Sequence, residues 1–131
     1  MPNVNVNINN SSRSSLTKNA FKTNDLRSAH IAEKIKEYID ENITSTFTLE
    51  IIASKFDISK SYLSHTFKKN FNTSVFQYIK HQRLSLAIKY YNSGIRLSIA
   101  AEKAGFEEYR AFYLAYRNQF GISPSKNIKI K

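Results

Sequence analysis

The chain of 131 residues is long enough for one domain of ordinary size, or for two small units that share a core. Its 20 lysines and arginines against 10 aspartates and glutamates give a formal net charge of +10, which favours a polyanionic partner, nucleic acid first and an anionic membrane surface second. The absence of cysteine excludes disulfides and thiolate metal sites. No apolar run approaches the roughly 20 residues that span a bilayer. We therefore expect the protein in the cytoplasm, on the nucleoid if the cell is bacterial, or in a nucleus.

Positive and negative charges are unevenly distributed along the chain. No carboxylate side chain lies between Asp57 and Glu102, although lysine and arginine recur there, and every charged side chain after Glu108 is basic. Carboxylates crowd an earlier segment instead, at Glu33, Glu37, Asp40 and Glu41. We therefore expect a basic side that binds a polyanion. The acidic stripe is interpreted as a solvated face, or as a contact for a partner such as RNA polymerase.

Residues 1–24 differ from the rest in being rich in asparagine and serine and free of acidic residues. Asparagine alternates there with valine or isoleucine over residues 3–8, which is the period of a strand, but one short strand without a partner is not stable. The segment is expected to be a flexible arm, or a linker that follows another domain. The domain itself is expected over residues 25–131.

From Asp25 onward apolar residues recur three and four positions apart, which predicts helices and no strand. Asp25 or Ser28 can cap the first helix, Thr48 the second and Ser74 a long one that Gly94 ends. The fold class is therefore all-α. Helices are expected over residues 25–42, 48–57, 58–71, 74–93, 99–104 and 109–119, and a last one begins with the proline of SPSKN.

Two segments of the chain repeat each other. The alignment sets LEIIASKFDI (49–58) over LSIAAEKAGF (97–106), which pairs Ala53 with Ala101, Asp57 with Gly105 and Ile58 with Phe106. The small residue lets a second helix cross closely, the turn residue tolerates a left-handed backbone, and the apolar residue fills the corner. Each copy therefore predicts a helix-turn-helix, a motif that places its second helix in a DNA major groove.

This motif assigns two sides to the second helix of the first copy. Leu63 and Phe67, one helical turn apart, are expected to face inward. The helix between the copies has roughly 20 residues and spans about 30 Å. That length is close to the 34 to 36 Å of about one DNA turn, so one chain can place two reading helices in successive major grooves. The residues expected to face DNA from the first copy are Ser61, Ser64, His65 and Lys68.

The chain resembles the DNA-binding domain of the AraC/XylS family of bacterial transcription regulators. The matching text is TLEIIASKFDISKSYLSHTFKKNFNTSVFQYIKHQRLSLA followed by LSIAAEKAGFEEYRAFYLAYRNQFGISPSK, within a match from about Ile31 to Lys129. The resemblance implies a homeodomain-like fold of two helix-turn-helix units, at about 48–71 and 97–120, joined by a long central helix at about 74–93. It also implies a sequence-specific, double-stranded DNA-binding transcription regulator, in most cases an activator.

Carried over position by position, the resemblance also assigns base-reading residues. Arg110 can bind guanine through two hydrogen bonds, and serine hydroxyls can bind several bases. Leu114 departs from the family, whose members often carry a polar or basic residue there. It can contact a thymine methyl, so the second unit is expected to read sequence less sharply. The base readers are Ser61, Ser64 and His65 in the first unit and Tyr109, Arg110 and Leu114, with Tyr113 adjacent, in the second.

The other basic residues of the two units are assigned to DNA phosphates, where they add affinity and little sequence information. The alternative is an ordinary solvated basic face. Arg83, in the long helix, is expected to hold a carboxylate or a helix end rather than DNA. The phosphate contacts are Lys60, Lys68, Lys69, Arg117 and Lys126. Core packing is expected for the aromatic residues at helical spacing, Tyr62, Tyr78, Phe112, Tyr116 and Phe120.

The sequence indicates neither a catalytic nor a metal site. His30, His65 and His81 are scattered without ligand spacing, and no set of nucleophile, base and orienting group is present, so neither an enzyme nor a cofactor is expected. Two further interpretations stay open. The chain can be the output half of a larger ligand-sensing regulator, or a helical protein-interaction domain with weak DNA binding.

Overall fold

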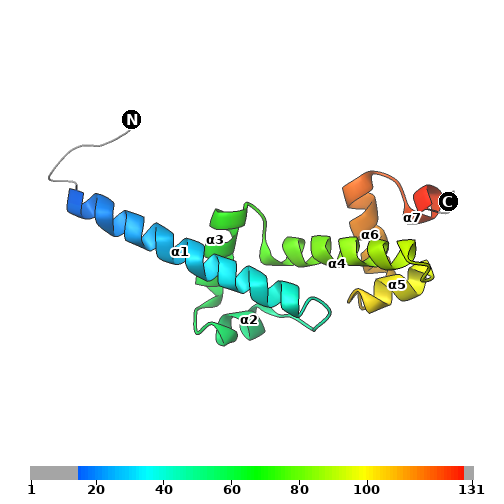
Figure 1. Ribbon diagram of the computed structural model, residues 1–131, viewed down its shortest axis with the longest axis horizontal. Coiled ribbons are helices and arrows are strands. Elements are labelled where there is room, and N and C mark those ends of the chain that lie inside the picture. The colour runs from blue at the N-terminus through cyan, green and yellow to red at the C-terminus, as the bar shows by residue number, and fades with distance from the viewer. Residues whose placement is uncertain (1–14, 129–131) are drawn as a thin grey trace.

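The computed structural model describes residues 15–128, with side chains from 25 to 127. Within that range the chain forms helices and no strand, which confirms the all-α fold class (Figure 1). The alternating segment at residues 3–8 lies outside the described residues. In the described part, no helix is both long enough and apolar enough to cross a membrane. The helices are α1 (Ser15–Glu41), α2 (Leu49–Lys55), α3 (Lys60–Phe71), α4 (Val75–Asn92), α5 (Leu97–Lys103), α6 (Tyr109–Phe120) and α7 (Pro124–Ile128).

The first helix begins at Ser15, earlier than expected, so residues 15–24 are part of α1 rather than of an arm. This stretch contains neither proline nor glycine, and nothing in it stops a helix. Asp25 and Ser28 therefore lie inside the helix and do not cap it. Ser28 is buried against α3, where its hydroxyl accepts a hydrogen bond from the Asn70 side chain at 2.9 Å.

Hydroxyl side chains cap the helices that follow. Thr48 accepts a hydrogen bond from the backbone N–H of Ile51, as predicted, and Ser59 does the same for Tyr62. Ser74 forms a capping box, in which its hydroxyl accepts from the backbone N–H of Gln77 while the Gln77 side chain accepts from the backbone N–H of Ser74. These caps set where α2, α3 and α4 begin.

The helices form two bundles joined along α4 (Figure 1). One core lies among α1, α2, α3 and the start of α4, and it includes Ile35, Ile52, Leu63 and Phe67. The second core lies among the rest of α4, α5 and α6, around Phe112. The apolar side of α4 thus turns from the first core to the second along its length, so this helix belongs to both bundles.

The internal repeat is present in the backbone of the two bundles. Asp57 has a φ of 55° and Gly105 a φ of 108°, both in the left-handed region that the predicted turns need. The repeat also extends into the preceding helix. The Lys55 ammonium lies 5.7 Å from the ring centre of Tyr38 in α1, and the Lys103 ammonium lies 5.9 Å from that of Tyr90 in α4. Each unit is therefore a three-helix unit, α1 to α3 and α4 to α6.

Candidate nucleic-acid interface

The inward and outward faces of α3 are as predicted from the sequence. Leu63 and Phe67 are fully buried, and the Phe67 ring packs on Tyr78 of α4 with ring centres 5.5 Å apart. The opposite face is exposed and forms one shallow groove. Five residues predicted to bind DNA line this groove together with Leu49, namely Lys60, Ser61, Ser64, His65 and Lys68.

Two of the lysines assigned to phosphates already have carboxylate partners. The Lys60 ammonium lies 3.0 Å from Glu50, and its hydrogen bond holds the pKa of that carboxyl below its usual range. Lys69 lies on a different face of α3, and its ammonium is 2.7 Å from Asp25 of α1. Both pairs are exposed, and exposed pairs contribute little to stability, so either lysine can exchange its partner for a phosphate at small cost.

The helix α6 is held in the second bundle by its buried aromatic residues. Phe112 and Tyr116 are buried, and the ring of Tyr109 packs on Phe112 with centres 5.4 Å apart. Partial burial of the Tyr109 ring raises the pKa of its phenol. Arg110 and Leu114 lie on the outer face, where Leu114 is 42% exposed.

The end of α6 and the short α7 enclose a second group of predicted residues. Arg117 and Lys126 line one cleft, with Tyr113 and Ser123 between α6 and α7. Gly121, with a φ of 82°, lets the chain turn sharply between the two helices. The two cations assigned to phosphates in the second unit therefore lie together at the C-terminal end of α6.

The prediction of core packing holds for only part of the aromatic set. Phe112 and Tyr116 are buried, and Tyr78 is half-buried. Tyr62 and Phe120 are 41% and 46% exposed, so their assignment to the core is wrong. Phe120 is the last residue of α6 and projects past the bundle, where its ring lies on that of Tyr116 with centres 4.5 Å apart. Helical spacing alone does not show where a bundle ends.

The outer faces of α3 and α6 turn toward the same side of the molecule. In Figure 1, α1 crosses over α3 and α4 crosses over α6, and each crossing pair is in contact. Both α3 and α6 run across the long axis in the same sense, α3 beside the start of α4 and α6 across its middle. One side of α3 is covered by α1, and the corresponding side of α6 is covered by α4. The opposite sides of α3 and α6 are therefore exposed on the same side of the molecule.

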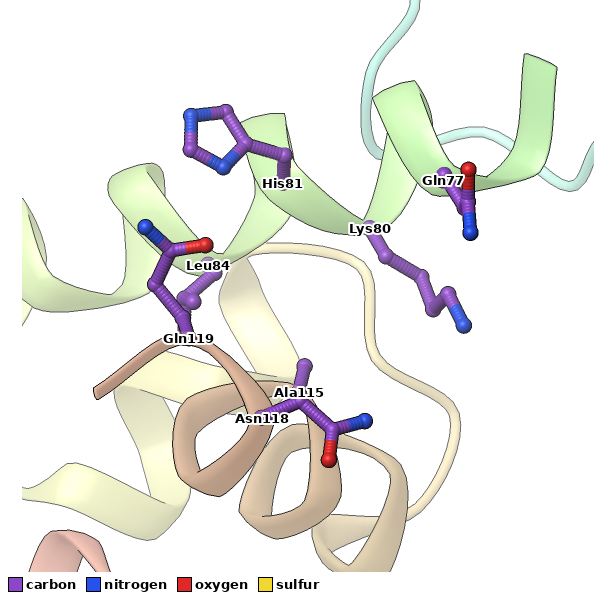
Figure 2. Close-up of a pocket in the computed structure, with 7 residues that line it drawn as sticks. All are labelled: Gln77, Lys80, His81, Leu84, Ala115, Asn118 and Gln119. Atoms are coloured by element: carbon purple, nitrogen blue, oxygen red, sulfur yellow. The ribbon is translucent and has the colours of Figure 1, made fainter. Parts of the chain in front are cut away.

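A polar cleft between α4 and α6 was not predicted from the sequence. It has a volume of about 220 Å³, and Figure 2 shows Lys80 and His81 on α4, across from Asn118 and Gln119 on α6. The only signal for it in the sequence is the carboxylate-free segment that contains Lys80 and His81. The residues that line the cleft are Gln77, Lys80, His81, Leu84, Ala115, Asn118 and Gln119, without a carboxylate.

Comparison with known proteins supports both the fold and the sequence motif. A family model described as a helix-turn-helix domain matches residues 52–129. The Msm operon regulatory protein of Streptococcus mutans is 36% identical over 95 residues, which is 71% of this chain and 34% of the relative. The multiple antibiotic resistance protein MarA of Escherichia coli is 30% identical over 93 residues, 70% of this chain and 73% of MarA. The chain thus spans about a third of the Msm regulatory protein and most of MarA.

Solved structures share the arrangement of helices. The C-terminal domain of the response regulator yesN from Fusobacterium nucleatum superposes with a TM-score of 0.66 and 30% identity, over 74% of this chain and 96% of that one. The DNA-binding domain of the transcriptional factor AdpA, solved with a target DNA, has a TM-score of 0.67 and 21% identity, over 72% of this chain and 86% of that one.

Proposed function

The chain belongs to the AraC-type family of helix-turn-helix DNA-binding transcription regulators, and on that premise we propose that it reads double-stranded DNA with α3 and α6 in two successive major grooves. The observation that carries this proposal is that the outer faces of α3 and α6 share one side of the molecule. The 18 residues of α4 span about 27 Å, which is comparable with the 34 to 36 Å between grooves one turn apart.

The two reading helices contribute different chemistry. In α3 the groove lined by Ser61, Ser64 and His65 offers hydroxyl and imidazole groups to base edges, and Lys68 lies beside them for a phosphate. In α6 Arg110 is the one guanidinium on the outer face near the start of the helix, so it is the residue best suited to guanine. Tyr109, Tyr113 and Leu114 complete the second reading surface, whose exposed leucine favours contact with a thymine methyl.

The regulatory role extends the same proposal. We assign the acidic face of α1 to a protein contact, with RNA polymerase as the partner of an activator that acts on the bacterial nucleoid. Its four carboxylates are exposed, at Glu33, Glu37, Asp40 and Glu41. The match to about a third of the Msm operon regulatory protein supports a second form of the proposal, in which these residues are the output part of a larger ligand-sensing regulator.

The roles of base and phosphate contacts can be separated by salt-dependent binding. DNA is enriched from a random pool, and fluorescence anisotropy compares it with a scrambled duplex. We expect Arg110→Ala to relax specificity at one position and to cost about 1 to 3 kcal/mol, whereas Lys68→Ala weakens all sequences alike and lowers the salt slope by about one. Lys34→Ala, in α1, where the exposed ammonium pairs with Glu37, is the control and should change neither quantity.

The wild type decides whether the two-groove proposal stands. A preference of at least about 10³-fold for the enriched DNA, with two blocks of bases about one turn apart, supports it. Equal binding of both duplexes, with an affinity that collapses in salt, would show a basic face without sequence reading.

A further inference from the structure

The two helix-turn-helix units meet at Arg83, in the middle of α4. The Arg83 side chain reaches the loop between α1 and α2 in the first unit. Its Nε donates a hydrogen bond to the carbonyl of Ile43 at 2.8 Å, and its Nη2 donates to the carbonyl of Ser45. The guanidinium carbon also lies 5.8 Å from the ring centre of Phe47, within the range of a cation–π contact. The prediction that Arg83 has a structural role is consistent with these contacts.

The other side of Arg83 packs on the second unit, at Gly105. A Cβ on Gly105 would lie 2.7 Å from the Nε of Arg83 and 3.2 Å from the carbonyl oxygen of Ile43. These distances are shorter than ordinary contacts, so the turn between α5 and α6 approaches the first unit as closely as a glycine permits. We call the set of Arg83, Ile43, Ser45, Phe47 and Gly105 the junction.

The junction explains a difference between the two copies of the repeat. The corresponding turn of the first unit has Asp57, with a φ of 55°, so a side chain is tolerated there. In the second unit the corresponding space is filled by Arg83, and the φ of Gly105 is 108°. A side chain is therefore disfavoured at Gly105 both by its φ of 108° and by Arg83, which occupies the space of a Cβ.

The contacts of Arg83 constrain the orientation of the two units more than they add to stability. Its hydrogen bonds go to two neutral carbonyls, and charge-assisted bonds of this kind depend on alignment. Burial of the guanidinium lowers the pKa of Arg83, and the nearby carboxylate of Glu107 acts in the opposite direction. The planar fork binds the loop of the first unit while its stem touches the turn of the second, so a rotation of one unit against the other breaks the arrangement.

We propose that Arg83 is the positioning residue that fixes the orientation of α3 relative to α6, and that it thereby sets which separation of two DNA half-sites the chain accepts. The proposal rests on the proposed function for its consequence, since two half-sites are read only if both helices enter DNA. The orientation itself is a property of the free protein. One inserted base pair moves a half-site by about 3.4 Å and turns it by about 35°, so a fixed orientation tolerates few separations.

The first test measures orientation without DNA. The chain has no cysteine, so Ser54→Cys in α2 and Ser98→Cys in α5, both exposed, can carry spin labels one in each unit. Electron–electron distance measurements are made in this background with Arg83, with Arg83→Gln and with Arg83→Lys. We expect a narrow distance distribution with Arg83, a broad one with Arg83→Gln and an intermediate one with Arg83→Lys, which keeps a charge but loses the fork.

The second test measures half-site separation. Anisotropy compares duplexes whose two blocks are separated by one base pair more or fewer, and a duplex with one block alone. We expect the wild type to lose about 10-fold or more in affinity per inserted base pair, a difference of about 1.4 kcal/mol, and Arg83→Gln to lose about 3-fold or less. Binding of the single block should stay within about 2-fold, because α3 and α6 are intact.

A pair of glycine variants tests the junction from its other side. Gly105→Ala places a methyl group against Arg83, whereas Gly94→Ala, at almost the same φ of 107°, meets no atom within 4 Å. Only Gly105→Ala should broaden the distance distribution and flatten the separation profile. An unchanged distribution in both Arg83→Gln and Gly105→Ala overturns the inference, whatever the protein does with DNA. A wild type that binds no two-block DNA overturns the proposed function instead.

Discussion

The substitution Gly105→Ala tests the junction through stability, with Gly94→Ala as its matched control. Both glycines have a φ near 108°, where an alanine costs about 1 to 3 kcal/mol in backbone strain. Only at Gly105 does the new methyl group also meet the Nε of Arg83, at 2.7 Å, and displace it from the carbonyls of Ile43 and Ser45.

The additional cost follows from those two hydrogen bonds. A hydrogen bond from a charged donor contributes about 1.5 to 3 kcal/mol, and partial exposure of Arg83 reduces this toward the low end, so the pair is expected to contribute about 2 to 3 kcal/mol. Gly105→Ala should therefore lower the free energy of unfolding by about 2 kcal/mol more than Gly94→Ala does. With a urea dependence of about 2 kcal/mol per molar, the two unfolding midpoints should differ by about 1 M.

Urea unfolding followed by far-ultraviolet circular dichroism measures this difference, and a double variant assigns it to Arg83. In an Arg83→Ala background the atom that the methyl group would meet is gone, so the excess cost of Gly105→Ala should fall by at least about half. The remainder reflects the carbonyl oxygen of Ile43, which stays 3.2 Å from the new Cβ. Equal midpoints for the two glycine variants, or an excess that persists in full without Arg83, would refute the reasoning.

Two further predictions concern α4 and its contact with α1. Ser74→Ala removes the capping box and should lower the free energy of unfolding in urea by about 1 kcal/mol. Ser85→Ala, at an exposed position in mid-helix, is the control and should change this free energy little. Equal effects of the two substitutions would contradict a capping role. Burial raises the pKa of Tyr78, and its hydrogen bond of 2.6 Å to Asp40 adds to the shift. Folding thus favours the protonated phenol, whose contribution to stability is full below about pH 10 and is lost as the pH rises further. The free energy of unfolding should therefore fall more steeply above about pH 10 in the wild type than in Tyr78→Phe. Parallel curves for the two proteins would contradict this.

Several features of the fold were predictable from the sequence because they depend on neighbours along the chain. Thr48 and Ser74 cap helices through groups three residues away, and a helical period places Leu63 and Phe67 on the inner face of α3. The repeat identified the turn at Asp57, since such a turn needs a residue that tolerates a positive φ. These are local effects, and local spacing in the sequence determines them.

Other features depend on residues that are distant in the sequence. Lys69 is a predicted phosphate contact, and the sequence gives no sign that its ammonium also lies 2.7 Å from Asp25, because that pair forms only where α1 crosses α3. Tyr62 is likewise 41% exposed and lines a cleft with Arg27 and Ser28 of α1, a neighbourhood that helical spacing does not reveal. Several side chains in the sequence are equally possible partners for each of these residues. Which partner each one contacts depends on long-range packing, so it could not be predicted from the sequence.

The all-α class, the two helix-turn-helix units and the inner position of Leu63 and Phe67 in α3 could be derived from the sequence alone. Each of these follows from periodicity and turn chemistry within about 20 residues. How the two units are oriented depends on long-range packing, through the contact of Arg83 with Ile43 and Gly105. The physical reason is that an arginine can bind any carbonyl within reach, and only the packing of α4 against both cores brings these particular groups together.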